Sequence, residues 1–406
     1  MFKKRPHKTQ SSKPKLLICS SFYFPEKGAA PYRITAMAEM LEFEVTVITP
    51  LPNYPTGKIF KGTFGEIFGT KMINGVKIVR YWVFPTNSNS RISRMLSLGV
   101  SAFTAFVALL RHFLLERTYQ VVIIQSPPLL SAFSYQLACN IFRQKTVINI
   151  SDIWPSTAVD LGAMRRGSIS WRVFRSMERY LYSHAEAFIA QSIESKDYLE
   201  RQSKKPVQLF RNLTQKKEGL RSRPSENAPV KIIYAGLLGK AQGVLSIIEG
   251  IDWQSINTEI HIYGDGNQKN SIKSINKKYV FCHDSLPKEE IQELMLQFDF
   301  SLIPLKNNIF GAFPSKIAAA VASQVPILFL GMGEGKKVVN KLGIGKTFNC
   351  ADFGNISEFL KGYFENRICL SSEFTNNLEK AITSEFCSRT NNEKLNIFLK
   401  KNFQKL

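Results

Sequence analysis

The sequence predicts an α/β protein made of two doubly wound, mainly parallel sheets. Short apolar runs alternate with helical segments along the 406 residues, and glycine-rich or acidic loops follow several of these runs. A polar, turn-rich stretch separates the alternation into two halves. The length suits two domains, because one domain usually takes roughly 100–200 residues. Ligands bind such sheets at the carboxyl ends of the strands, so we expect a ligand in a cleft between the domains.

Shifts in composition give the expected boundaries. We expect a basic flexible tail over residues 1–14, a first domain over 15–212, a linker over 213–229, a second domain over 230–385 and a C-terminal helix over 386–406. The tail lacks the apolar core of a signal peptide, and its basic residues could also bind anionic lipid. The six cysteines form no close pair, which is typical of reduced thiols in a cytoplasmic protein.

The formal charge of +22 indicates an anionic partner, such as nucleotide phosphates, a membrane surface or nucleic acid. The chain has no zinc-finger spacing, no aromatic motif of an RNA-binding sheet and no dense basic block outside its ends. These absences argue against nucleic acid.

The first half opens with a strand, Leu16–Ser20, and a loop over residues 21–33. A helix over Arg33–Leu41 and a strand over Glu44–Thr49 complete a βαβ unit. The loop holds one glycine, Gly28, so it is a candidate ligand loop but no dinucleotide fingerprint.

The segment Met95–Leu115 is long and apolar, with Arg91 and Arg94 before it. Its length approaches the ~20 residues of a membrane span. We expect no span, because the strands Val76–Val83 and Val121–Gln125 on either side would then lie on opposite sides of a bilayer. Two alternatives remain: a buried helix of the sheet layer, or a helix with one face in the membrane interface. The basic flanks favour the second.

The strand Thr146–Ile150 is followed by Asp152 and Trp154. An aspartate at such a place is usually a helix cap. Together, the acid and the indole could also hold a sugar by hydrogen bonding and stacking.

In the second half, the strand Lys231–Ala235 enters a glycine-rich loop, 236–243, that contains Lys240. Such a loop suits a diphosphate. It is no Walker motif, because Ser or Thr does not follow at the right spacing. The next strand, Glu259–Tyr263, also ends in glycines, at 264–266.

The stretch 311–326, GAFPSKIAAAVASQVP, follows the strand Phe300–Leu305 and contains Lys316 before a helix of small residues, Ile317–Ser323. A helix start with unpaired N–H groups and an adjacent lysine forms an anion site. An ordinary βαβ unit with a solvated Lys316 is the equal alternative.

The order of these motifs resembles the GT-B glycosyltransferases of family 4, and within them the bacterial WbuB/WcaI type described as L-fucosamine transferases. The resemblance covers residues 15–345 and rests on these stretches: SFYFPEKGAAPYR, LPNYPTGKIF, SPP, SDIWPSTAVDLGAM, YAGLLGKAQG, IYGDGN and LIPLKNNIFGAFPSKIAAAVASQVPI.

The resemblance implies two Rossmann-like domains, a nucleotide-sugar in the second, an acceptor in the first, and a C-terminal helix that packs back on the first. It also implies retained anomeric configuration and no metal or cofactor. Two lysines would stabilise the leaving diphosphate: Lys240 and Lys316. The implied donor-binding residues are Gly28, Ala29, Gly236, Gly239, Gln242, Gly243, Gly264, Asp265, Gly266, Phe313, Pro314 and Ser315. The implied acceptor-binding residues are Arg33, Asp152 and Trp154.

The chain departs from this family at three places. Gly311 and Ala319 stand where many relatives have glutamates. Leu237 and Gln242 replace the usual Arg and Lys of the glycine-rich loop, and Ser156 replaces an acid after Trp-Pro.

We therefore expect a retaining transferase that moves a sugar, with an N-acetylated deoxyhexosamine as the candidate, from UDP to a polyprenyl-diphosphate-linked saccharide of capsule or O-antigen synthesis. It would be cytoplasmic and peripheral on the inner face of the cell membrane, with an anionic membrane surface as a partner and no nucleic acid. The alternative from another class is a catalytically weakened GT-B scaffold of a polysaccharide assembly complex, motivated by the missing carboxylates. An epimerase of the same architecture would have no need of the apolar helix.

Overall fold

The computed structural model describes residues 13–54, 56–60, 68–88, 90–116, 118–211, 227–240, 242–275, 277–306 and 309–403. The predicted tail over 1–14 and linker over 213–229 therefore lie almost wholly outside the described residues. The described residues fall into two compact units. Unit 1 comprises those within Met1–Asn149, Met177–Phe188 and Lys394–Leu406, and unit 2 comprises those within Ile150–Ser176 and Ile189–Glu393.

The first sheet has eight strands in the order β3-β4-β2-β1-β5-β6-β7-β8. Strand β1 pairs in parallel with β2 and β5, and β4 pairs in parallel with β2. The edge strand β3, which the sequence analysis did not predict, is antiparallel to β4. The bounds are β1 Lys15–Cys19, β2 Glu44–Pro50, β3 Phe68–Ile73, β4 Val76–Tyr81, β5 Val121–Ser126, β6 Thr146–Ile150, β7 Ala187–Ala190 and β8 Val207–Leu209.

The second sheet lies in unit 2 and has six parallel strands in the order β11-β10-β9-β12-β13-β14. The order reverses direction beside β9, which gives this sheet the switch point of a doubly wound fold. The bounds are β9 Val230–Ala235, β10 Thr258–Tyr263, β11 Val280–His283, β12 Phe300–Leu305, β13 Ile327–Gly331 and β14 Gly345–Phe348. The two sheets confirm the predicted α/β fold class.

Helices connect the strands of both sheets. In the first sheet's connections they are α1 Ala29–Met40, α2 Arg91–Leu115, α3 Leu129–Ile141, α4 Ser156–Asp160, α5 Ile169–His184 and α6 Ile193–Ser203. Those that follow are α7 Val244–Gly250, α8 Lys269–Lys273, α9 Lys288–Leu294, α10 Ser315–Ala322, α11 Glu334–Leu342, α12 Phe353–Glu365, α13 Arg367–Ala381 and α14 Ser388–Phe403. A single 3₁₀ turn, Met295–Gln297, and a π-helical turn, Ile382–Phe386, complete the list.

Three helices begin earlier than the sequence predicted. Helix α1 starts at Ala29 instead of Arg33, because Pro31 is tolerated in a first turn. Helix α2 starts at Arg91, since the Ser90 hydroxyl accepts a hydrogen bond from the N–H of Ser93. Helix α10 starts at Ser315 rather than Ile317.

Unit 2 has a continuous apolar core on one face of its sheet. Trp253 and Tyr363 are fully buried there beside Phe300, and the carboxylate of Asp299 holds the surrounding segments together. That carboxylate accepts hydrogen bonds from the N–H of Lys231 and the hydroxyl of Tyr363, and it forms a buried ion pair with Arg367.

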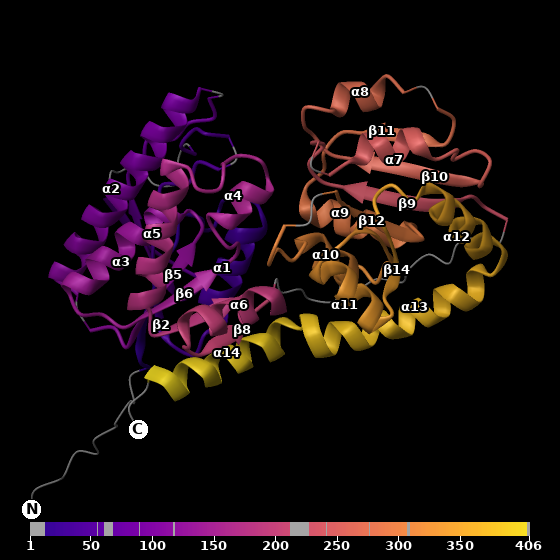
Figure 1. Cartoon of the computed structure of the whole chain (residues 1–406). Coiled ribbons are helices and arrows are strands. Elements are labelled where there is room, and N and C mark those ends of the chain that lie inside the picture. Colours follow the sequence, from indigo (N-terminus) through magenta and orange to yellow (C-terminus); the bar gives the residue numbers. More distant parts are fainter. Residues whose placement is uncertain are drawn as a thin grey trace, which may run out of the picture. The chain divides into compact units, whose positions relative to one another are not determined.

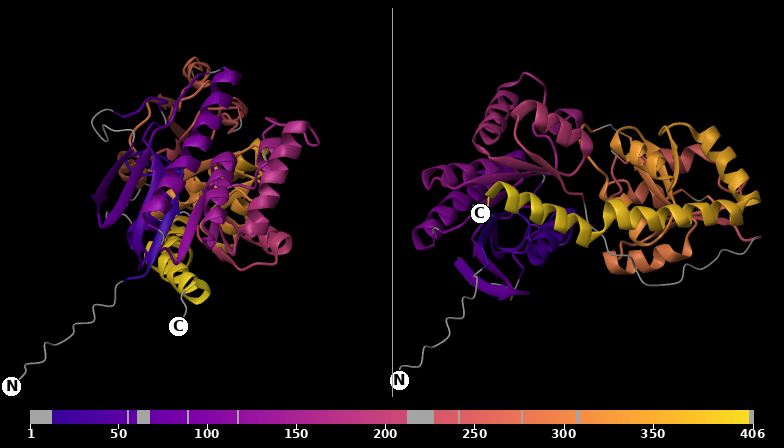
Figure 2. Two further views of the ribbon diagram at one scale, coloured as in Figure 1. Left: turned by 90° about the vertical axis from the view of Figure 1, so that its left-hand side faces the viewer. Right: turned by 90° about the horizontal axis from the view of Figure 1, so that it is seen from below.

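Helix α2 lies beside α3 and also contacts β2 and β4 (Figures 1 and 2). Its inner face, with Ala105, Leu109 and Phe113, is buried, whereas Phe103 and Leu114 on its outer face are 66% and 64% exposed. Within the described residues, only Ile92–Leu115 is long and apolar enough to cross a membrane, by length and composition alone. The helix therefore belongs to the sheet layer and also presents an apolar outer face.

Candidate functional site

The loops after β9 and β10 pack backbone against backbone. The N–H of Gly236 donates to the carbonyl of Tyr263 at 2.9 Å, and the N–H of Leu238 donates to the carbonyl of Asp265 at 2.8 Å. A Cβ atom at Gly264 or Gly266 would collide with the backbone of Gly236 or Leu238. The structure thus brings the glycine-rich loop and the 264–266 turn together, and only glycine fits at the contact.

Lys316 lies against this glycine contact. A Cβ at Gly236 would overlap the ammonium of Lys316 and lie 2.6 Å from its Cε. The Nζ atom is 3.9 Å from the ring centroid of Tyr234, the fifth residue of β9. Burial lowers the pKa of Lys316 to about 7, so the charge state of this amine responds to an anion placed beside it. Lys316 is half-buried, so its amine is less solvated than that of an exposed lysine.

The N-terminus of α10 carries the remaining predicted residues of the same stretch. Ser315 is its exposed first residue, and Pro314 before it provides no side-chain cap. Phe313 is buried, with the guanidinium of Arg211 4.4 Å from its ring centroid. Phe313 therefore supports the loop, while Ser315 is exposed at a helix N-terminus whose first N–H groups have no partner within the helix.

The far end of the glycine-rich loop starts α7. Gly243 has a φ of 69° and caps the helix without a side-chain hydrogen bond. The N–H of Gln242 donates to the carbonyl of Gly239 at 3.2 Å, and Lys240 is exposed. A Cβ at Gly243 would lie 3.5 Å from the Cβ of Lys306, a lysine that the sequence analysis did not single out.

Two buried acceptors border this loop. Gln242 Oε1 and Gln268 Oε1 are buried and accept no hydrogen bond within the described part of the chain. Buried polar atoms in proteins nearly always have a partner. A ligand hydroxyl or amide in the loop would provide one.

The predicted sugar-binding loop lies beside the 310–311 turn of unit 2. Trp154 packs edge-on against Phe174 with ring centroids 6.1 Å apart. Between Asp152 and Trp154, the buried Ile153 would lie 3.3 Å from a Cβ at Gly311. The structure thus places Asp152 and Trp154 near the loop that leads to Lys316.

Gly311 itself leaves no room for a side chain. Its φ is 76°, and its carbonyl accepts the hydroxyl groups of Ser192 and Ser195 at 2.7 and 2.9 Å. A Cβ at Gly311 would collide with the Ser195 Oγ. This packing is the physical reason why a glutamate at position 311 would not fit this chain. The other departure, Ala319, is half-buried on α10.

A buried ion pair that sequence reasoning missed lies beside Phe313, because its arginine, Arg211, contacts the Phe313 ring. Arg211 Nη1 lies 2.9 Å from Glu334 Oε1, and both side chains are 2% exposed. The other oxygen of Glu334 accepts the N–H of Glu194 at 2.9 Å. Glu334 directly follows Gly333 after β13, so its place in a glycine loop was the available signal, whereas nothing marked Arg211.

In unit 1, Glu26 fixes the loop that carries Gly28 and Ala29. Its carboxylate, 3% exposed, accepts the N–H groups of Asn53 and Tyr54, both at 2.9 Å. Gly28 precedes α1 without a side-chain cap, and Arg33, assigned to the acceptor by resemblance, is 4% exposed. These residues all belong to unit 1.

Replacing Gly311 should test the serine contact. We expect Gly311→Ala to lower the free energy of unfolding by about 1–2 kcal/mol, because its φ is left-handed, and by a further amount from the collision with Ser195. Gly362→Ala in α12, where a Cβ meets nothing within 4 Å, is the control, and it should stabilise the helix by roughly 0.5–1 kcal/mol. Urea denaturation measures both, and equal stability of the two variants would contradict the account.

In sequence, the chain is similar to glycosyltransferases. Residues 29–211 match the model of the Glycosyl transferase 4-like domain. The chain is 26% identical over 294 residues to a protein of Pseudomonas aeruginosa described as "Probable glycosyltransferase WbjE". That alignment covers 66% of this chain and 70% of the relative.

Solved structures of low sequence identity share the fold. Sucrose-phosphate synthase from Thermosynechococcus elongatus has a TM-score of 0.71 at 11% identity, covering 96% of this chain and 99% of that one. Anabaena Alr3699/HepE in complex with UDP has a TM-score of 0.66 at 12% identity, covering 95% and 100%. WaaG, a glycosyltransferase involved in lipopolysaccharide biosynthesis, has a TM-score of 0.62 at 12% identity, covering 94% and 99%. Residues 29–211 are thus similar to the Glycosyl transferase 4-like domain, and the chain has the GT-B fold and is similar in sequence to a probable glycosyltransferase.

Proposed function

We propose that the chain is a retaining, metal-independent glycosyltransferase that transfers a sugar from a UDP-sugar to a polyprenyl-diphosphate-linked saccharide in surface polysaccharide synthesis. An N-acetylated deoxyhexosamine, as in the WbuB/WcaI-type enzymes, is the candidate sugar. The observation that carries the proposal is the ammonium of Lys316 against the Gly236 turn, at the carboxyl end of β9.

The chemistry requires stabilisation of a departing nucleoside diphosphate. In the donor, the bond between the anomeric carbon of the sugar and the diphosphate breaks, and negative charge builds on the leaving phosphate. N–H groups fixed at the start of α10 and in the 236–243 loop, with Lys316 and Lys240, are suited to stabilise that charge without donating a proton. The amine of Lys316 gains its charge as the diphosphate approaches, because an anion raises the pKa of a desolvated amine.

The comparisons support a nucleotide-sugar as the donor. HepE is described in complex with UDP and with UDP and glucose, and WaaG is described as acting in lipopolysaccharide synthesis. The buried acceptors Gln242 Oε1 and Gln268 Oε1 offer partners for donor hydroxyl groups.

A second candidate is a non-catalytic GT-B scaffold of a polysaccharide assembly complex. The tight packing of Gly311 favours it, since no carboxylate can stand at that position. The two candidates differ in turnover. Incubation with a panel of UDP-sugars and a lipid-linked acceptor should release UDP and form a product of retained anomeric configuration, as read by NMR. UDP binding without any transfer would favour the scaffold.

The lysines should contribute to nucleotide binding. We expect Lys316→Ala and Lys240→Ala each to weaken UDP binding by roughly 1.5–3 kcal/mol, as charge-assisted hydrogen bonds do. Lys346→Ala, an exposed lysine on β14, is the matched control and should bind as the wild type does. Fluorescence competition measures all three. Unchanged affinity in both site variants would remove these lysines from the site.

The depressed pKa of Lys316 gives a pH dependence with a defined sign. Above pH 7 the free protein holds a neutral amine, so binding of a charged diphosphate takes up a proton. We expect the affinity for a UDP-sugar, whose diphosphate does not titrate in this range, to fall by up to about tenfold per pH unit above 7. Lys316→Met should flatten the profile. An equally steep fall in that variant would contradict the assignment.

We also propose that the outer face of α2 rests in the membrane interface, where a lipid-linked acceptor resides. Its exposed apolar side chains include Leu96, Phe103 and Leu114, and the chain carries a formal charge of +22. By contrast, Phe106 and Leu110 are half-buried and less suitable as probes.

Vesicle flotation tests this position. Changing Leu96, Phe103 and Leu114 together to Ser should lower partition onto anionic vesicles more than tenfold, because each apolar side chain contributes about 1.5–3 kcal/mol when buried. Ile169→Ser with Val173→Ser, which removes exposed apolar side chains of α5, is the control. Binding that survives the triple change would exclude the helix as an anchor.

A further inference from the structure

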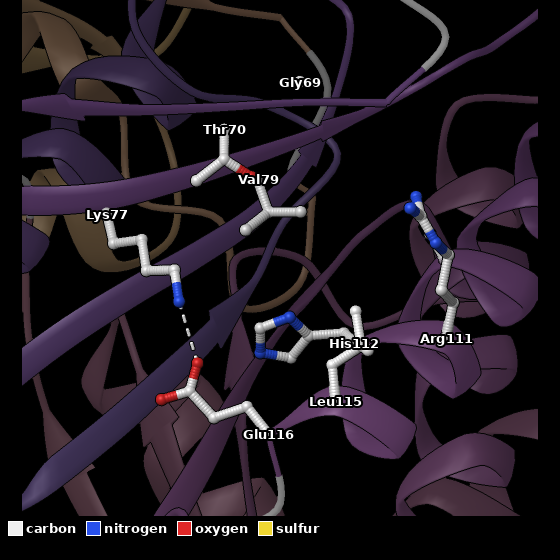
Figure 3. Close-up of a pocket in the computed structure, with 9 residues that line it drawn as sticks. Gly69, Thr70, Lys77, Val79, Arg111, His112, Leu115 and Glu116 are labelled. Carbon is white, nitrogen blue, oxygen red and sulfur yellow. Dashed lines mark hydrogen bonds and ion pairs between the residues drawn. The ribbon is translucent and has the colours of Figure 1, made fainter.

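A cavity lies in unit 1, between the C-terminal half of α2 and the strands β3 and β4 (Figure 3). It has a volume of about 350 Å³, which is large enough for a small polar group. Its lining residues are Gly69, Thr70, Lys77, Val79, Ala108, Arg111, His112, Leu115 and Glu116. The proposed sugar transfer involves none of these residues, although Ala108, Arg111, His112 and Leu115 belong to the predicted apolar segment Met95–Leu115.

One end of the cavity lies at the amino ends of the strands, opposite to the carboxyl ends where ligands of this fold bind. Lys77 is the second residue of β4, and Lys15, which pairs with the lining residue Glu116, is the first residue of β1. Because β1, β2 and β4 are parallel, these residues mark the amino ends of the strands. The loop with Gly28 follows the carboxyl end of β1 and contributes no residue to the lining of the cavity.

The charges of the lining favour an anion. Glu116 accepts hydrogen bonds from Lys15 at 2.6 Å and from Lys77 at 2.8 Å, and these bonds lower its pKa to about 2. Burial lowers the pKa of His112 to about 4, so its ring is neutral at pH 7 and shares a hydrogen bond with the hydroxyl of Tyr119. Among the lining residues, Lys77 and Arg111 are basic and Glu116 is acidic.

An apolar surface borders the same cavity. Leu115 belongs to the lining and is 78% exposed, and Leu114 beside it is 64% exposed. Further along α2, Val107 and Phe103 continue the exposed row, four and eight residues before Arg111. A ligand with an anionic head beside Arg111 and a hydrocarbon chain along this row would match both features. A free anion would use only the first.

We infer that this cavity binds the phosphate headgroup of an anionic membrane lipid and thereby fixes the orientation of unit 1 on the bilayer. Arg111 and Lys77 would meet the phosphate, and the Thr70 hydroxyl would donate a hydrogen bond to it. The inference rests on the proposed membrane position of α2 and is independent of sugar transfer. The apolar face of α2 alone would bind any bilayer, whereas the cavity would make the chain prefer anionic lipids.

Flotation with two vesicle compositions separates the headgroup site from the apolar anchor. The full chain is mixed with phosphatidylcholine vesicles, with and without phosphatidylglycerol. We expect Arg111→Gln to reduce binding to the anionic vesicles about fivefold and to leave binding to phosphatidylcholine unchanged. Arg179→Gln, an exposed arginine of α5 in the same unit, removes the same charge and should have a smaller effect.

A second variant keeps the net charge. Thr70→Val suits an edge strand and should also lower binding to the anionic vesicles several-fold, since it removes only a hydroxyl. If Arg111→Gln and Thr70→Val lower binding to anionic vesicles no more than Arg179→Gln does, the inference is wrong. Binding of glycerol phosphate that Arg111→Gln weakens, with no loss of binding to anionic vesicles in that variant, would also overturn it, by assigning the cavity to a soluble phosphate. UDP binding, measured on the same preparations, should not change in any of these variants, so a failure of the transferase proposal remains distinguishable.

Discussion

The close approach of two backbones at the ends of β9 and β10 is the constraint on which the candidate site depends. Gly264 and Gly266 allow the 236–238 turn to come within hydrogen-bonding distance, and the missing side chain of Gly236 leaves the space that the ammonium of Lys316 occupies. A half-buried, poorly solvated amine at a helix start is costly by itself. The proposed diphosphate would offset that cost, because an anion beside the amine stabilises its charged form.

The architecture was predictable because parallel strands buried on both faces are continuous apolar runs, and the glycine loops at their ends are visible in the sequence. The stretch 311–326 indicated the place of Lys316 correctly, but not that its amine would lie against Gly236 and over Tyr234. Such contacts join residues some eighty positions apart, and no local pattern encodes them. The assigned roles of the loop residues remain predictions.

Other elements escaped sequence reasoning for identifiable reasons. Strand β3 is a partly polar edge strand, so its pairing with β4 decides its conformation. The Arg211–Glu334 ion pair and the hydrogen bonds of Glu26 are tertiary contacts of single residues. The departure at Gly311 was visible, yet its cause, the two serine hydroxyl groups on its carbonyl, appears only in the folded chain. For α2, the sequence left open a buried helix of the sheet layer or a helix with one face in the membrane interface. The structure shows a buried inner face and an exposed apolar outer face, so the two alternatives do not exclude each other.

The account makes the glycine-rich loop and Lys316 a site for a nucleoside diphosphate held without metal. Calorimetric titration of the full chain with UDP, repeated in EDTA, tests this claim most directly. The account predicts saturable binding whose enthalpy and affinity are the same with and without the chelator. Heat-silent titrations with UDP, GDP and other nucleotides, or binding that EDTA abolishes, would contradict it.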